Sequence, residues 1–128
     1  MPSGSPPNPV VMAYRRKLAA ARTAHRREAE RLAAALSAGG ASKVILFGSV
    51  AQRRDSFSSD LDLVAISEAV RDVPFHIRTA QALSQLQPSI RTDLLIYTPE
   101  EWDELRATRR FVRREISDKG VVLYERPQ

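Results

Sequence analysis

Two short apolar runs separated by a polar segment limit what this chain can fold into. The first, Ser42–Phe47, ends at a Gly-Ser pair, and the second, Leu61–Ile66, begins between Asp60 and Asp62. Runs of about four to six apolar residues bounded by Gly, Ser and Asp are typical of buried strands and are far too short to span a membrane. We therefore expect two strands of a sheet that is covered on both faces.

Helix signals surround these strands. Residues 10–38 are rich in Ala, Arg and Leu and contain no Gly or Pro, which favours one long helix ended by a Gly-Gly pair. Thr98-Pro99-Glu100-Glu101 is typical of a helix start. We expect, in addition, a helix from Pro74 to Leu86, strands Ile90–Tyr97 and Val121–Glu125, and a helix from Pro99 to Gly120. This order predicts an α/β (α+β) domain with a small mixed sheet and a long N-terminal helix.

Composition excludes several classes of site. None of the 128 residues is a cysteine, so disulfides, thiolate metal sites and cysteine nucleophiles are excluded. Residues 1–9 contain no basic start followed by an apolar stretch, so we expect a disordered tail rather than a secretory signal, and a cytoplasmic protein.

The net charge of +5 belongs to the predicted N-terminal helix, because residues 10–38 hold seven basic and two acidic residues. This basic helix fits a solvated face, a docking or dimerisation surface, or a contact with nucleic acid. Base stacking needs aromatic residues among the arginines, and Tyr14 is the one aromatic residue in this segment. Of the two binding roles we therefore expect docking or homo-oligomer formation, and no nucleic-acid partner.

Three carboxylates indicate a metal site. Residues two apart on a strand share a face, so Asp60 and Asp62 project together and repel each other unless a cation lies between them. Oxygen ligands without histidine or cysteine favour a hard ion such as Mg²⁺. Asp93 opens the third strand, and if that strand neighbours the second, three carboxylates meet at one sheet edge. Such an edge could hold two magnesium ions for displacement at a phosphate.

We expect the Gly48-Ser49 turn to form the phosphate-binding part of this site. Glycine lets the backbone approach a ligand closely, and the N–H groups that open a helical turn favour phosphate. We therefore expect a nucleoside triphosphate between the turn and the metal ions.

These residues resemble a known signature. Gly48-Ser49-x10-Asp60-Leu61-Asp62 within "LFGS…SDLDLVAI" is similar to the motif of the DNA polymerase β-like nucleotidyltransferase superfamily, and the short connections resemble its minimal nucleotidyltransferase (MNT) branch. The resemblance covers about residues 32–125 and assigns residues 39–128 to a minimal nucleotidyltransferase domain.

The resemblance implies Mg²⁺-dependent transfer of a nucleotide, AMP from ATP, to a hydroxyl group. By position, Asp60, Asp62 and Asp93 would be metal ligands, and Asp93 would accept the proton of the incoming hydroxyl. Gly48 and Ser49 would hold the β- and γ-phosphates. The family often has an Arg directly after Gly-Ser and a Gly where the turn closes, whereas this chain has Val50 and Arg54. Arg53 or Arg54 could replace the missing phosphate contact, and we assign Arg53 to the nucleotide site.

The resemblance also implies a partner. Proteins of the MNT branch are often antitoxins paired with HEPN-domain toxins, and some resemble enzymes that adenylylate a tyrosine of the toxin. The alternative is an antitoxin that neutralises its partner by binding alone, which the altered positions Val50 and Arg54 favour.

Overall fold

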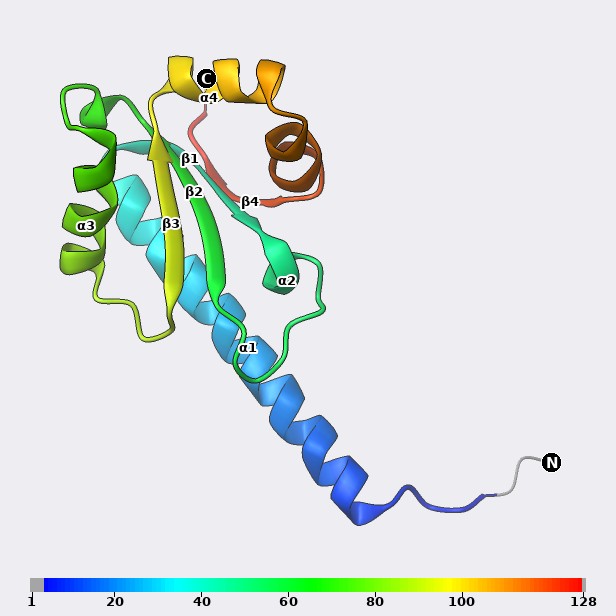
Figure 1. Ribbon diagram of the computed structural model, residues 1–128. Coiled ribbons are helices and arrows are strands. Elements are labelled where there is room, and N and C mark those ends of the chain that lie inside the picture. Colours follow the sequence, from blue (N-terminus) through cyan, green and yellow to red (C-terminus); the bar gives the residue numbers. More distant parts are fainter. Residues whose placement is uncertain (1–3, 128) are drawn as a thin grey trace.

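The computed structural model describes residues 4–127 and contains one four-stranded sheet in the order β3-β2-β1-β4 (Figure 1). Strand β1 is antiparallel to both β2 and β4, whereas β2 and β3 are parallel. The sheet is therefore mixed, as predicted. The elements in chain order are α1 Pro9–Ala38, β1 Ala41–Phe47, α2 Gly48–Ala51, β2 Leu61–Ser67, η1 Glu68–Val70, α3 Phe75–Leu86, β3 Thr92–Tyr97, α4 Pro99–Thr108, η2 Val112–Asp118 and β4 Val121–Glu125.

Helices cover both faces of the sheet. Helices α1 and α3 pack on one face, against a core that includes Leu63 and Leu94. Helix α4 and the π-helical segment η2 pack on the other, where Trp102 and Ile116 meet Val64. Side chains alternate along β2 and β3, so neighbouring residues of each strand serve opposite faces. This double cover explains the continuous apolar runs of the two central strands.

Helix α1 begins where Asn8 caps it, its side chain accepting a hydrogen bond from the backbone N–H of Val10 at 2.8 Å. Its second half enters the core through Ala29 and Leu32, both 0% exposed. Its first half extends past the sheet into solvent (Figure 1) and leaves Tyr14 exposed. No helix within residues 4–127 combines the length and apolar character needed to cross a membrane.

The predicted tail, residues 1–9, is shorter in the structure. Pro9 already belongs to α1, and residues 4–8 form neither helix nor strand. Residues 1–3 lie outside the described part of the chain.

One helix prediction was wrong. The single helix expected from Pro99 to Gly120 is two pieces, because Arg109 is extended, with φ −112° and ψ 108°. Trp102 and Ile116 pack into the same apolar cluster. A straight helix would separate them by about 21 Å along its axis, so the chain must turn between them. The predicted start is confirmed: Thr98 and Glu101 form a capping box.

Candidate active site

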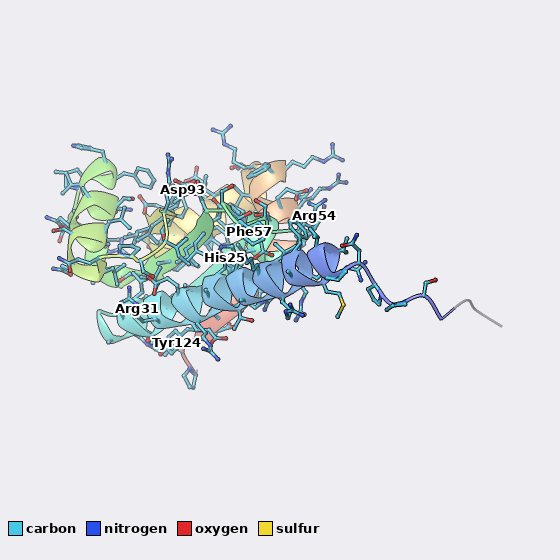
Figure 2. The ribbon with its side chains drawn as sticks, turned by 90° about the horizontal axis from the view of Figure 1, so that it is seen from below. His25, Arg31, Arg54, Phe57, Asp93 and Tyr124 are labelled. Carbon is cyan, nitrogen blue, oxygen red and sulfur yellow. The ribbon has the colours of Figure 1, made fainter. Side chains whose placement is uncertain are left out.

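The three predicted carboxylates come to the sheet end at which β2 and β3 begin. Asp62 lies directly opposite Asp93 in the parallel register of these strands. Asp60 precedes β2 by one residue, where the backbone N–H of Leu61 donates to the carbonyl of Arg91 at 2.9 Å. By strand alternation the carboxylates belong to the face opposite α1 and α3. Figure 2 views the molecule from this end, with Asp93 labelled.

Asp62 is held in an unfavourable environment for a negative charge. Burial raises the pKa of its carboxyl group to about 6, with smaller contributions from the charges of Asp93 and Asp60 and from a hydrogen bond shared with Asp93. A carboxyl–carboxyl hydrogen bond requires a proton on one partner. At this edge the protein therefore brings together two carboxyl groups that repel each other when both are ionised.

Gly48 lies against the side chain of Asp62. Its φ is +77°, a left-handed conformation that favours glycine. A Cβ atom built on Gly48 would lie 2.3 Å from Oδ2 of Asp62, far inside contact distance. Phe47, the preceding residue, pairs with Asp62 across the β1–β2 ladder. Glycine is thus needed here so that the turn can approach the carboxylate.

The loop of residues 52–60 connects the Gly-Ser turn to Asp60. Ser49 donates its hydroxyl hydrogen to Oγ of Ser59 at 3.3 Å, which ties the turn to the far end of the loop. The left-handed residue that closes the turn is Arg53, with φ 57°, and not Arg54, the position that the family resemblance suggested. Arg54 donates to the side chain of Gln52. Arg53 lines a hollow against α1.

Within residues 4–127, no three Asp, Glu or His side chains converge closely enough to form a finished metal site. Asp60 lies 3.7 Å from Nε of Arg91, measured from its Oδ2. The donor set nevertheless suits Mg²⁺, because all three side chains offer oxygen and a divalent cation would offset both the burial of Asp62, the main cause of its raised pKa, and the repulsion from Asp93 and Asp60. When an ion binds, Asp60 would give up its contact with Arg91 and coordinate the ion instead.

Two polar contacts that sequence analysis missed fix the loops beside the carboxylates. Nδ1 of His25 in α1 lies 2.7 Å from Oδ2 of Asp55, and the two residues are 4% and 3% exposed. Nothing in the polar sequence of this loop marks Asp55 as buried.

The second contact fixes the loop before β3. Glu28 of α1 accepts two hydrogen bonds from Arg31, at 2.6 and 2.8 Å, and one from the backbone N–H of Ser89 at 2.5 Å. Arg31, followed by the Ser89 contact, holds the pKa of Glu28 at about 2. Helix α1 therefore fixes both loops that lead to the carboxylates.

No protein-family model matches this chain, and no curated protein matches it significantly in sequence. Among solved structures it is similar to a candidate nucleotidyltransferase from Sulfolobus solfataricus, with a TM-score of 0.60 over 83% of this chain and 85% of that chain. The fold is that of a nucleotidyltransferase. The two sequences are 15% identical, so the similarity establishes the fold and leaves the reaction to be argued from the site.

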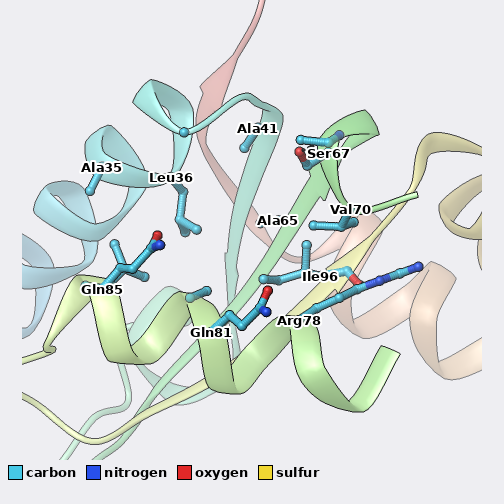
Figure 3. A pocket seen from close by; sticks show the side chains of 14 residues that line it. Ala35, Leu36, Ala41, Ala65, Ser67, Val70, Arg78, Gln81, Gln85 and Ile96 are labelled. Atoms are coloured by element: carbon cyan, nitrogen blue, oxygen red, sulfur yellow. Dashed lines mark hydrogen bonds between the residues drawn. The ribbon is translucent and has the colours of Figure 1, made fainter. Parts of the chain in front are cut away.

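In this nucleotidyltransferase fold the carboxylates do not share a face with the hollow shown in Figure 3. That hollow, of about 170 Å³, lies between α1 and α3 and is lined by small side chains such as Ala35, Ala41 and Ala65. Ala65 belongs to the β2 face opposite Asp62. A triphosphate held at the carboxylate edge would therefore occupy the open end of the sheet and not this hollow.

Proposed function

We propose that this chain is a Mg²⁺-dependent nucleotidyltransferase that moves AMP from ATP to a hydroxyl acceptor. The observation that carries the proposal is the placement of Asp62 opposite Asp93, with Gly48 against the Asp62 carboxylate. Carboxylates crowded at the edge of a core are costly unless a cation joins them. The nucleotidyltransferase fold supports the same class of reaction.

Different residues of this edge would bind the metal ions and the phosphate groups. Asp60, Asp62 and Asp93 would hold two Mg²⁺ ions, which when bound supply charge neutralisation at the triphosphate. Gly48 and Ser49 would bind the β- and γ-phosphates through the turn that opens α2. Arg53 would add a positive charge from the same loop.

Asp93 is the proposed proton acceptor, since its side chain is exposed at the start of β3. It would take the proton of the acceptor hydroxyl as the oxygen attacks the α-phosphorus. The bond between the α-phosphorus and the bridging oxygen then breaks, and pyrophosphate leaves.

The acceptor we propose is a tyrosine of a HEPN-type toxin, which would make the chain an antitoxin. The support is the resemblance of "LFGS…SDLDLVAI" to the MNT branch. The second candidate is an antitoxin that acts by binding alone. It is favoured by Val50 in the place of the usual arginine and by Arg91 beside Asp60.

The test is transfer of label to a HEPN-type partner protein, with ATP labelled at the α- or the γ-phosphate. We expect Mg²⁺-dependent labelling from α-labelled ATP alone, reduced at least a hundredfold in Asp93→Asn. Equal labelling by Asp93→Asn would refute the assigned role of that residue.

The two candidates differ in cells that produce the toxin. Transfer predicts that the double variant Asp60→Ala/Asp62→Ala, if folded, no longer protects those cells. Full protection by this variant would favour neutralisation by binding.

A further inference from the structure

A basic hollow lies on the seam between α1 and the loop of residues 52–60. Arg15, Arg22 and Arg26 line it from α1, and Arg53 lines it from the loop. At 100° per residue the three helix arginines fall within about 40° of one another, on one flank of α1. Together with Arg53 they surround a hollow of about 490 Å³, which we call the arginine seam.

Most of the positive charge of the arginine seam is not neutralised. Nε of Arg22 donates to the backbone carbonyl of Asp55 at 2.8 Å and lies 3.5 Å from its carboxylate. That carboxylate is also engaged by His25. Arg15, Arg26 and Arg53 have no acidic partner within residues 4–127. The seam therefore presents three uncompensated guanidinium groups, which are suited to phosphate groups.

Two exposed aromatic rings come from the same two elements as the seam, and one of them, Tyr14, directly precedes Arg15 in α1. Tyr14 of α1 and Phe57 of the loop pack edge to face, with ring centroids 5.5 Å apart. They are 56% and 47% exposed, so much of each ring remains open to solvent. Phe57 is labelled beside α1 in Figure 2. The sequence showed one aromatic residue among these arginines, and the fold brings a second one to it.

We propose that the arginine seam and the Tyr14–Phe57 pair bind single-stranded nucleic acid. The guanidinium groups would contact phosphates of the strand, and the exposed rings would stack on unpaired bases, as in other sequence-tolerant single-strand sites. A duplex keeps its bases stacked inside and offers the rings nothing to bind. This inference goes beyond the proposed function and does not depend on it.

The backbone of Arg53 supports a role for its side chain. Its left-handed φ of 57° is a conformation that glycine adopts without strain, yet the position carries an arginine that lines the seam. The same loop ends at Asp60, so a strand bound in the seam would lie next to the carboxylate edge.

The test is fluorescence anisotropy with labelled 12-nucleotide RNA and DNA single strands, titrated with the full chain at several salt concentrations. We expect saturable binding whose affinity falls steeply with salt, as phosphate contacts require. If one of the two strands binds more tightly, that result would show whether RNA or DNA is the natural ligand. Failure of both strands to bind would overturn the proposal.

A matched pair of variants distinguishes binding at the arginine seam from attraction to any basic surface of α1. Arg15→Glu/Arg26→Glu removes two seam arginines, whereas Arg16→Glu/Arg27→Glu makes the same charge change about 100° away around α1. We expect at least a tenfold loss of affinity and a shallower salt slope for the first variant, and a much smaller loss for the second. Equal losses would refute a specific site. Circular dichroism confirms that both variants are folded.

The rings are tested by Tyr14→Ser/Phe57→Ser, which should weaken binding about tenfold with the salt slope unchanged. Two competitors complete the test. A 12-base-pair duplex that binds more tightly than the single strands would contradict stacking. An acidic peptide of twenty glutamates that displaces the strand at equal concentration would mean that the seam is an acidic-protein surface instead.

Discussion

The identity of Gly48 is tightly constrained by its surroundings. Its positive φ disfavours any side chain, and a Cβ atom placed there would come within 2.3 Å of Asp62. Gly48 is thus needed to leave room for the Asp62 carboxylate, in addition to any contact with phosphate.

We therefore predict that Gly48→Ala lowers the free energy of unfolding by about 2–4 kcal/mol, from left-handed strain plus the clash with Asp62. Gly39→Ala is the matched control. Gly39 has φ −82°, and a Cβ there would meet its nearest neighbour at 3.5 Å. Urea unfolding should show a change of at most about 0.5 kcal/mol for the control. Equal effects of the two changes would contradict this account of the turn.

Asp62 illustrates the cost of placing a carboxylate at the edge of a core. Its pKa is raised from 3.8 to about 6 in the folded protein, so the folded state binds more protons than the unfolded state between these values. The contribution of Asp62 to stability should therefore fall as pH rises from 3.8 to about 6.

Asp62→Asn removes the destabilising effect of the ionised carboxylate. In metal-free buffer we predict that it raises the free energy of unfolding at pH 7 by about 1 kcal/mol, after allowance for solvent screening of a half-buried group. The gain should vanish below the ordinary pKa of the carboxyl group. Asp72→Asn, an exposed carboxylate elsewhere, should leave stability within about 0.5 kcal/mol at either pH. A gain for Asp62→Asn that did not vary with pH would contradict the assigned cause.

At the scale of elements, α1 acts as the support for the site loops. Its contact to Asp55 is buried, its contact to Ser89 is partly buried, and both are polar and reach the loops before β2 and β3. A helix that supplied only apolar packing would leave the position of these loops undefined. Here each loop is fixed by a hydrogen bond to a side chain of α1, from His25 or Glu28.

We predict that His25→Ala lowers the free energy of unfolding by about 2 kcal/mol, because the buried Asp55 carboxylate loses its closest partner and keeps Arg22 at 3.5 Å. Asp55→Ala should cost a similar amount. The double variant should lose little more than either single variant, since the two residues act as a pair. Additive losses in urea unfolding would show that they do not.

At the scale of the whole molecule, the apolar runs and the Gly and Pro boundaries predicted the sheet and its helices, because burial and chain breaking are local in sequence. Asp60, Asp62 and Asp93 each stand at the start of an apolar run, but the sequence brings them together only if β3 neighbours β2, and the parallel pairing of these strands meets that condition. The break at Arg109 could not be predicted. It results from the need of Trp102 and Ile116 to reach one cluster.

The surroundings of the site could not be predicted either. The burial of Asp55 and the packing of Phe57 against Tyr14 depend on which loop meets α1, a tertiary fact that loop composition does not contain. The positive φ of Arg53 could not be predicted, since an arginine gives no sequence signal of a left-handed conformation.

The central claim is that the carboxylate edge and the Gly-Ser turn form a metal-dependent nucleotide site. Isothermal titration calorimetry of Mg-ATP against the natural chain and Asp62→Asn tests it most directly, with ATP plus EDTA and Mg-GTP as comparisons. The account predicts binding that requires Mg²⁺ and is lost in Asp62→Asn, although that variant is folded and at least as stable. Binding that persists in Asp62→Asn, or no binding by the natural chain, would contradict it.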